Sequence, residues 1–396
     1  MIIIPKRFNH LFEQIISDEN LSIAIDEVNR THRWHKYHIP NKCTAWVQLT
    51  KSERIIELRN ILINGFIPSK PRISERYDMC AQKWRTITEP KQYPDQYIHH
   101  ALIQVLQPIF MRHMDEYCCG SIQGRGTHKG KKAIEKWIRT DKKGTKYELY
   151  IDIYHFYDSI VPNIVMDRMR HLIKDGQTLT LIENIIKDGI SIGAYTSQWF
   201  ANTFLQPLDK LIRNSGYAKY YVRYMDNLTI FGSNKRDLRK LKILIEQWLH
   251  VHSLKLKSDW QIFDTSKRIP DAMGFRYGKT YTIPRKYNLL RLKRYIKRYR
   301  KRRDAGKSIS AQMVSSIMSR LGQLKHCNNN NIYNRLFQGE KIMCEFRKIL
   351  RRDTLNTKLT WDSFLEYFTE KKLTIERGES MDSSTINIIV SASVFK

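Results

Sequence analysis

Two acidic segments in the middle of the chain have the residue types and the setting of a metal site. Asp152 stands near the end of an apolar, β-rich stretch, residues 147–153, and several aromatic residues follow it. Asp226 lies in the turn Met225-Asp226-Asn227, between two further β-rich stretches, residues 219–224 and 228–231. A carboxylate at the end of an apolar strand is costly unless it binds something positive.

A hairpin with an acidic tip would place Asp226 beside Asp152. Two such carboxylates can bridge a pair of divalent metal ions about 3.5–4 Å apart, which activate an attacking hydroxyl and stabilise a leaving pyrophosphate. Each segment alone is weak evidence. A strand-end aspartate is usually a capping or turn residue, and Asp-Asn is common in plain hairpin turns.

The elements that must position these residues alternate between helices and strands. Apolar residues at helical spacing predict helices over residues 10–36, 52–63 and 95–117, and residues 80–90 predict a short strand with a loop. A helix over residues 237–249 precedes further short strands up to Tyr277. The middle of the chain therefore predicts an α+β domain.

Beyond Pro284 the sequence becomes helical and strongly basic. Eleven lysines and arginines lie between Arg285 and Arg303, with no acidic residue among them. They are too dense to face a protein core and would repel one another without a polyanion. The Asn328 to Asn331 run predicts a loop between the next two helices.

The composition of the whole chain also favours a polyanionic partner. Among 396 residues, 69 are Lys or Arg and 39 are Asp or Glu, so the formal net charge is +30. Nucleic acid is the leading candidate, and 11% aromatic content argues against a basic structural protein of the ribosomal kind. The six cysteines show no zinc-like spacing and are interpreted as reduced, packed thiols. No signal peptide or membrane-spanning run is evident, so a cytoplasmic location is expected.

In their order, and with Gly193 to Asn202 between them, the two acidic segments resemble the reverse transcriptase family. Asp152 matches the first metal aspartate, and Tyr224 to Asn227 matches the YxDD box. Tyr157 matches the bulky steric gate against ribonucleotides, and Gly193 and Gln198 belong to the segment that supports template and incoming nucleotide. The resemblance implies a right-hand polymerase fold and RNA-directed DNA synthesis from deoxynucleoside triphosphates. It also implies two Mg²⁺ or Mn²⁺ ions, held by Asp152, Asp226 and the backbone of Ile153.

Further segments extend the resemblance over roughly residues 80 to 300. Lys83 and Arg85 resemble the basic residues that hold the triphosphate, Arg125 resembles a further arginine of the nucleotide site, and Lys257 resembles the lysine that protonates pyrophosphate. Charge-assisted bonds to phosphate oxygens are among the stronger hydrogen bonds. The remaining matches are to the primer grip (Met273, Gly274, Phe275) and to thumb cations that contact the nucleic-acid backbone (Lys293, Arg294, Lys297, Arg298).

One position departs from the family, because its second box aspartate is Asn227 here. Asparagine keeps an oxygen ligand but loses a charge, so weaker metal binding and a preference for manganese are expected. A non-catalytic RNA-binding scaffold is therefore an alternative, although two acids in a basic cleft would mostly repel one another without metal. An RNA-directed RNA polymerase is a third option, opposed by the ring of Tyr157, which should clash with a 2′-hydroxyl.

The segment from Ile192 to Gln198 is similar to that of bacterial diversity-generating retroelements and of related phage-defence reverse transcriptases. Asn227 and the long N-terminal helical region favour the defence-associated class, with diversity generation as the alternative. That class implies a structured non-coding RNA as template, a DNA product, and self-assembly or an accessory protein. No membrane partner is expected.

The sequence predicts five parts. They are a helical N-terminal extension (residues 1–75), fingers (76–145), a palm with part of the fingers (146–283), a basic helical thumb (284–352) and a tail (353–396). The tail is too short for a further nuclease domain.

Overall fold

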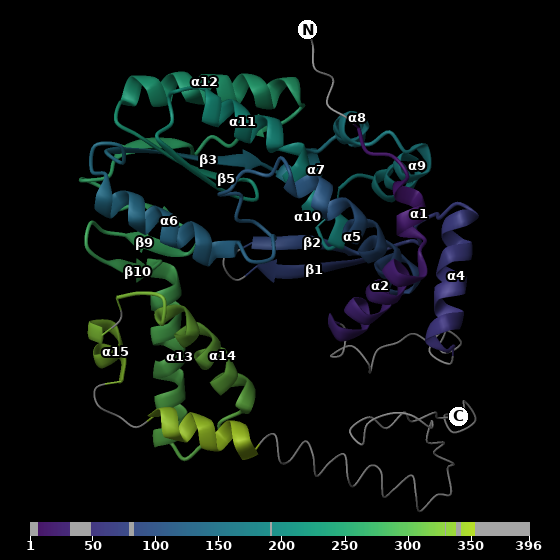
Figure 1. Cartoon of the computed structure of the whole chain (residues 1–396). Helices are drawn as coiled ribbons and strands as arrows, with labels where there is room; N and C mark the ends of the chain where they lie inside the picture. Colours follow the sequence, from purple (N-terminus) through teal and green to yellow (C-terminus); the bar gives the residue numbers. More distant parts are fainter. Residues whose placement is uncertain are drawn as a thin grey trace, which may run out of the picture. The chain divides into compact units, whose positions relative to one another are not determined.

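The computed structural model describes residues 7–31, 49–78, 83–190, 192–328, 330–337 and 342–352 (Figure 1). The chain divides into two compact units, Met1–Thr282 and Ile283–Lys396. Each unit is described by itself. Within the described residues, no helix is long and apolar enough to cross a membrane.

A five-stranded antiparallel sheet forms the centre of the first unit. Its order is β4 (Tyr220–Tyr224), β5 (Asn227–Gly232), β3 (Tyr147–Tyr154) and β6 (Lys255–Leu256), and β7 (Gln261–Asp264) also pairs with β3. The strands predicted over residues 147–153, 219–224 and 228–231 are confirmed to within one residue at each end.

The central strand β3 has two different faces. Leu149, Ile151 and Ile153 are buried, whereas the next residues along, Tyr150 and Asp152, are only partly covered. This alternation follows from the two-residue period of a strand. The apolar face shares a core with α12 (Lys235–Val251), whose Leu238, Leu241, Ile245 and Leu249 recur at helical spacing.

Helices cover both sides of this sheet. Figure 1 shows α12 and α11 (Gln206–Asn214) on one side and α6 (Gly126–Thr140) on the other. The remaining helices after β3 are α7 (Phe156–Ser159), α8 (Pro162–Leu172), α9 (Gly176–Ile186) and α10 (Tyr195–Phe204). Mixed helices and antiparallel strands confirm the predicted α+β class.

The N-terminal helices belong to the same hydrophobic core as the sheet. They are α1 (Leu11–Ile15), α2 (Asp18–Thr31) and α4 (Lys51–Ile63), and their buried residues join those of α5 (Tyr97–Met111) in one cluster. Thr50 and Glu53 form a reciprocal capping box at the start of α4. These helices are therefore packed into the first unit.

A two-stranded hairpin lies between α4 and α5 in the chain. β1 (Arg72–Asp78) pairs along its whole length with β2 (Lys83–Glu89), and a short π-helical turn, η3 (Gln92–Gln96), leads into α5. The sequence predicted only the second of these strands. The boundary placed between residues 75 and 76 falls inside β1.

The helix predicted over residues 95–117 ends earlier, at Met111. The residues that follow pair with the edge strand β4: the Cys119 N–H donates to the Arg223 carbonyl, and the Arg223 N–H donates to the Tyr117 carbonyl. These sheet-like bonds use backbone groups that a longer helix would have needed for itself.

A small sheet completes the first unit. It consists of β8 (Asp271–Ala272), β9 (Phe275–Tyr277) and β10 (Thr282–Pro284), and the division between the units falls within β10.

The second unit has its own helical core. Its helices are α13 (Lys286–Asp304), α14 (Ala311–Leu324) and α15 (Asn330–Phe337). Leu292, Ile296 and Tyr299 of α13 are buried in this core together with Val314 and Ile317 of α14. The predicted loop at residues 328–331 is shorter than expected, because α15 already begins at Asn330.

Candidate active site

The register of β3 against β5 brings the two aspartates together. Asp152 on β3 lies opposite Asn227, the first residue of β5, so Asp226, the residue before Asn227 in the hairpin turn, is next to this pair. The Ile153 N–H donates to the Asp226 carbonyl at 3.3 Å, which ties the tip to the end of β3. The hairpin predicted from the sequence therefore forms, with its acidic turn beside Asp152.

The two carboxylates form an electrostatically unfavourable pair. Burial raises the pKa of Asp226, and the charge of Asp152 raises it further, against the opposing effects of Arg85 and Asn227. A cation between them would remove this repulsion. Within the described residues, no group of three or more His, Cys, Asp or Glu side chains could hold a metal ion. Two carboxylates suffice for Mg²⁺, which is usually bound by one or two of them together with water and substrate phosphates. The residues present therefore fit a catalytic cation.

Lys257 lies next to Asp152. Its N–H donates to the Asp152 carbonyl at 3.0 Å, and its Nζ lies 3.4 Å from Asp152 Oδ2 and 2.7 Å from Asp259 Oδ2. The hydrogen bond to Asp259 raises the pKa of Lys257 most, so the ammonium stays protonated. This places the predicted proton donor next to the predicted metal ligand.

A buried arginine that the sequence reasoning missed holds the hairpin tip. Arg223 of β4 has no exposed surface, and its guanidinium donates to Asp209 at 2.7 and 2.8 Å. The same guanidinium donates to the Met225 carbonyl at 3.1 Å and to Asn202 Oδ1 at 2.9 Å. Removing one partner of such a buried pair typically costs about 3–5 kcal/mol. An arginine within an otherwise apolar strand was the available signal.

The tip itself is held in a strained backbone conformation. Met225 has φ 55°, a left-handed conformation that costs a non-glycine residue about 1–2 kcal/mol. Gly120 packs so closely that an added Cβ would lie 2.4 Å from Met225 Sδ. Asn202, the last residue of the segment matched to the family, donates to the Gly120 carbonyl at 2.9 Å. This hydrogen bond therefore helps to hold Gly120 against Met225.

Asn227 makes two hydrogen bonds through its side-chain amide. The Tyr150 hydroxyl donates to Asn227 Oδ1 at 2.7 Å, and Asn227 Nδ2 donates to Asp226 Oδ1 at 3.1 Å. The oxygen expected to serve as a ligand is thus an acceptor for Tyr150. In this arrangement the amide orients Asp226. Tyr150 had not been singled out, because the hydrogen bond depends on the register between β3 and β5.

Two further predicted site residues interact electrostatically with Asp226: Tyr157, on α7, and Arg85, on β2. His155, with φ 42°, turns the chain sharply after β3 into α7, which carries Tyr157. Burial raises the pKa of Tyr157, and the charge of Asp226 raises it further, while Arg85 of β2 opposes both. The positive charge of Arg85 also lowers the pKa of Asp226. The side chain of Lys83 lies outside the described residues.

Gly193 allows α10 to approach the hairpin. Its φ is +126°, and an added Cβ would lie 2.6 Å from the carbonyl oxygen of Thr88 on β2. The Thr88 N–H donates to the Ile192 carbonyl at 2.8 Å. Gln198, on the helix that follows, is exposed. A glycine is required here because of the close backbone contact.

Arg125 stands at the start of α6. Its guanidinium donates to the Asp115 carbonyl at 2.5 Å. It lines a pocket of about 630 Å³ together with His128, Lys129 and Lys132. The structure therefore gives Arg125 basic neighbours, and its role with a nucleotide remains a prediction.

The predicted primer grip is a tight turn between β8 and β9. Met273 and Gly274 have φ 54° and 85°, as a two-residue hairpin turn requires. Met273 packs against Gly130, where an added Cβ would lie 2.2 Å from Met273 Sδ, and Phe275 is buried beneath Lys131 of α6. Both side chains therefore anchor the turn to α6.

The four predicted thumb cations share one face of α13. Lys293, Arg294, Lys297 and Arg298 are all exposed, whereas Leu292, Ile296 and Tyr299 are buried. The cations are thus available to solvent along about two turns of helix.

The family model described as reverse transcriptase (RNA-dependent DNA polymerase) matches residues 68–263. A search of curated proteins found no match. Similar solved structures include telomerase from Candida albicans in complex with a fragment of telomeric RNA, at 12% identity and TM-score 0.44, covering 58% of this chain and 50% of that one. Apo telomerase from Candida tropicalis (11%, 0.41, 55% and 49%) and its C-terminally truncated form (13%, 0.40, 60% and 59%) are also similar. The chain spans about half the length of the first two.

The matched region begins just before β1 and ends in β7, so it contains both aspartates, Tyr157 and the segment from Gly193 to Asn202. It leaves out the β8–β9 turn and the second unit. The expected right-hand polymerase fold is that of this family. Residues 68–263 are therefore a reverse transcriptase domain, the domain of the RNA-dependent DNA polymerases, which are nucleotidyltransferases.

Proposed function

We propose that this chain copies RNA into DNA at the site formed by Asp152 and Asp226. The observation that carries this proposal is the register of β3 against β5, which sets two carboxylates side by side in a strongly basic protein. Two divalent cations, Mg²⁺ or Mn²⁺, would be held by Asp152, Asp226 and the backbone of Ile153. When bound, they activate the primer 3′-hydroxyl and stabilise the charge on the leaving pyrophosphate.

The chain's own residues supply binding and orientation. The charge of Arg85 acts on Asp226, which supports a role for Arg85 in holding the triphosphate of a bound nucleotide, with Lys83 and Arg125 as further candidates. Lys257, protonated beside Asp152, is the proposed proton donor to pyrophosphate. Tyr157 is the proposed barrier to a 2′-hydroxyl, and Gly193 and Gln198 are proposed to support the template and the incoming base.

The decisive experiment compares Asp152→Ala and Asp226→Ala with Asp158→Ala. Asp158 is a matched control because it lies on α7, close in sequence to the site, with a side chain 72% exposed. We expect deoxynucleotide incorporation on an RNA template to fall by several orders of magnitude in the first two variants and to stay unchanged in the control. RNA affinity should be retained in all three.

Two results would contradict this assignment. Incorporation by Asp226→Ala within about tenfold of the unmodified protein, or roughly 1.4 kcal/mol, would remove the metal-ligand role. A protein that binds RNA but incorporates no nucleotide with either Mg²⁺ or Mn²⁺ would favour the non-catalytic scaffold.

We further propose that the enzyme serves antiphage defence with a structured non-coding RNA as template. The supporting features are the sequence from Ile192 to Gln198 and the asparagine at position 227. The test expresses the gene with its neighbouring DNA in a bacterial host and measures phage plating with and without Asp226→Ala. It also sequences the RNA that copurifies. Templated changes in a neighbouring gene without phage protection would support diversity generation instead.

A further inference from the structure

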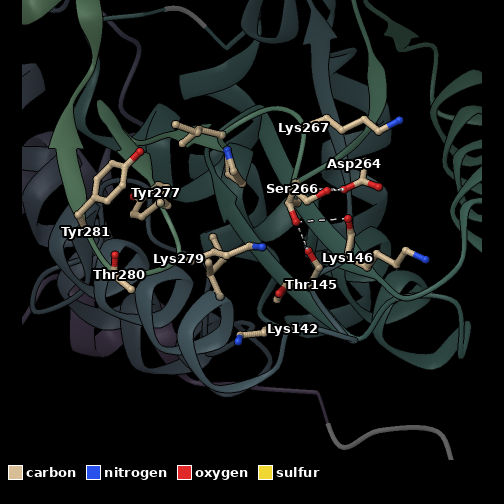
Figure 2. A pocket seen from close by; sticks show the side chains of 15 residues that line it. Lys142, Thr145, Lys146, Asp264, Ser266, Lys267, Tyr277, Lys279, Thr280 and Tyr281 are labelled. Carbon is tan, nitrogen blue, oxygen red and sulfur yellow. Dashed lines mark hydrogen bonds between the residues drawn. The ribbon is translucent and has the colours of Figure 1, made fainter.

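A pocket far along β3 from the aspartates is lined by lysines from three segments. It has a volume of about 590 Å³ and lies between the turn after α6, the turn after β7 and the loop between β9 and β10. Lys142 and Lys146 come from the first turn, Lys267 from the second and Lys279 from the loop. Figure 2 shows Lys146 and Lys267 on the right of this pocket, Lys142 below it and Tyr281 on the left.

The positive charge of this pocket is not neutralised by ion pairs. In the part of the chain that the structure describes, none of the four lysines forms a salt bridge. Among the described residues, Asp264 is the one carboxylate that lines the pocket. Its Oδ1 accepts from the Ser266 N–H at 2.8 Å and hydroxyl at 2.6 Å, and these bonds lower its pKa most. Four lysines and one carboxylate give the lining of this pocket a positive charge, which attracts an anion with several negative charges.

Hydrogen bonds within the chain hold the walls of the pocket together. The Thr265 N–H donates to the Lys146 carbonyl at 3.0 Å, and the Thr265 hydroxyl donates to the Thr145 carbonyl at 2.7 Å. The Thr145 hydroxyl in turn donates to the Asp141 carbonyl at 2.7 Å. These bonds fix the two turns against each other, so a ligand would not need to order the backbone.

One side of the pocket is aromatic. Tyr281 is 39% exposed, and its ring lies against Gly278, where an added Cβ would be 2.6 Å from the ring. A concave pocket of this volume, inside the usual range of about 300–1,000 Å³ for ligand sites, can admit a single unstacked nucleotide but not the backbone of a duplex. Lysines for phosphates and an aromatic ring for a base are the usual parts of a single-strand site.

We propose that this lysine pocket binds a single-stranded stretch of nucleic acid outside the catalytic site. Lys146 immediately precedes β3, and Asp152 lies at the sixth position of that strand, about 20 Å away at roughly 3.3 Å per residue. A strand a few nucleotides long can span this distance. The pocket therefore holds the single-stranded flank of a substrate whose reacting end is at the aspartates. The binding does not depend on polymerisation.

The test measures equilibrium binding of a labelled 20-nucleotide RNA without divalent cations. Lys142, Lys146, Lys267 and Lys279 are changed together to glutamine. The control changes four exposed lysines that line none of the pockets described above: Lys91, Lys174, Lys187 and Lys240. Each set lowers the formal net charge from +30 to +26, because four positive charges are removed. A general effect of charge is thus the same in both proteins.

The salt dependence distinguishes a site from general attraction. Each phosphate contact of a single strand contributes about −0.7 to the slope of log affinity against log salt. We expect the pocket variant to reduce the steepness of this slope by about 2–3 and the control by less than about 1. Equal changes in the two proteins would overturn the proposal.

Two further variants keep the test decisive if the fourfold variant does not fold. Changing only Lys267 and Lys279, which leaves the two lysines next to α6 and β3 in place, should reduce the slope by about 1.4. Tyr281→Ala should weaken binding at least about fivefold without changing the slope, whereas Tyr281→Phe should bind as the unmodified protein does. Tyr281→Ala binding within twofold would remove the stacking role.

The choice of probe identifies the ligand. Single-stranded RNA and DNA should both depend on the four lysines, and their relative affinity shows which strand is preferred. A duplex should show less of this dependence. The proposal fails if the duplex depends on the lysines as strongly as the single strands do, or if poly-glutamate of equal charge depends on them while RNA does not. Loss of incorporation in Asp226→Ala leaves these binding results unaffected, so the two proposals can fail separately.

Discussion

At the tip of the β4–β5 hairpin, two hydrogen bonds define what Asn227 does. Tyr150 on β3 is the diagonal neighbour of Asn227. Its hydroxyl donates a hydrogen bond to Asn227 Oδ1, the oxygen that would otherwise be free to bind a cation. The amide nitrogen then points to Asp226. A carboxylate at this position would add charge for a cation but would also repel Asp226 when no cation is bound. The chain thus has a neutral hydrogen-bond donor where the family has a third acid.

Tyr150→Phe should lower incorporation by about fivefold, equivalent to roughly 1 kcal/mol for one net hydrogen bond, because the Asn227 amide loses its fixed orientation. Tyr154→Phe is the matched control, since Tyr154 lies on the same face of β3 and is 49% exposed. The assay is single-nucleotide extension at saturating cation. An effect of the Tyr154 change alone would contradict the role given to Tyr150.

Asn227→Asp should be tolerated and should increase Mg²⁺-supported activity, because it restores a charged ligand. The measurement is a titration of activity with Mg²⁺ and Mn²⁺, together with direct Mn²⁺ binding by electron paramagnetic resonance. Tighter Mn²⁺ binding is expected. Complete loss of activity with unchanged Mn²⁺ affinity would mean that the hydrogen bond to Asp226 cannot be replaced by charge.

Tyr157→Ala should raise the use of ribonucleotides relative to deoxyribonucleotides by about tenfold or more, equivalent to roughly 1.4 kcal/mol of lost discrimination. The reason is steric, since the ring lies near Asp226 where the sugar of an incoming nucleotide is expected. Tyr157→Phe keeps the ring and should keep the selectivity. Equal selectivity in all three proteins would favour RNA synthesis as the activity.

At the scale of elements, strand β3 carries two carboxyl groups in different environments. Asp152, near its end, is partly open to solvent, whereas Glu148, near its start, is 1% exposed and its Oε2 has no hydrogen-bond partner within the described residues. Burial, reinforced by the charge of Asp271, raises the pKa of Glu148 from 4.5 to about 8. Glu148 is therefore protonated at neutral pH in the folded protein.

This protonation predicts how stability depends on pH. The folded protein keeps a proton that the unfolded chain releases above pH 4.5, so the contribution is complete below that pH and is lost as pH rises through about 8. Between pH 5 and 9, the free energy of unfolding, measured with urea, should therefore fall less for the Glu148→Gln variant than for the unmodified protein. Glu246→Gln, half exposed on α12, is the control. Parallel curves for Glu148→Gln and the unmodified protein would show that Glu148 ionises normally.

At the scale of the whole molecule, the chain carries a large excess of positive charge. The net charge of +30 supplies general attraction to nucleic acid, and such attraction carries no information about where a strand lies. Local arrangement is therefore needed to separate functional cations from the rest. The exposed face of α13 and the lysine pocket are two such arrangements, one in each unit.

Replacing Lys293, Arg294, Lys297 and Arg298 with glutamine should reduce the salt slope for a template–primer duplex by about 2–4, and similarly for unrelated sequences. The physical reason is the loss of phosphate contacts along the exposed face of α13. The Lys91, Lys174, Lys187 and Lys240 set again controls for net charge. If the slope for the duplex does not change, α13 is not a thumb helix that follows the backbone.

The amino-acid sequence alone determined the features that depend on local patterns. The β-rich stretch over residues 147–153 predicted β3, apolar spacing predicted α4, α12 and α13, and the acidic turn between two β-rich stretches predicted the hairpin. These succeed because strand and helix periods are short-range properties. The order of Asp152, Gly193 and Asp226 was also sufficient to indicate the family. The hairpin strand β1 was missed because its residues, Arg72 to Asp78, are mostly polar and exposed.

Only the tertiary structure decided which side chains meet. The bonds of Arg223 to Asp209 and of Tyr150 to Asn227 depend on which strands and helices become neighbours, and on their register. The early end of α5 at Met111 depends on β4, because the following backbone pairs with that strand rather than continuing the helix. The raised pKa of Glu148 likewise comes from its burial in the assembled sheet. Sequence patterns do not carry this information, since each contact joins residues far apart in the chain and forms only when the core has assembled.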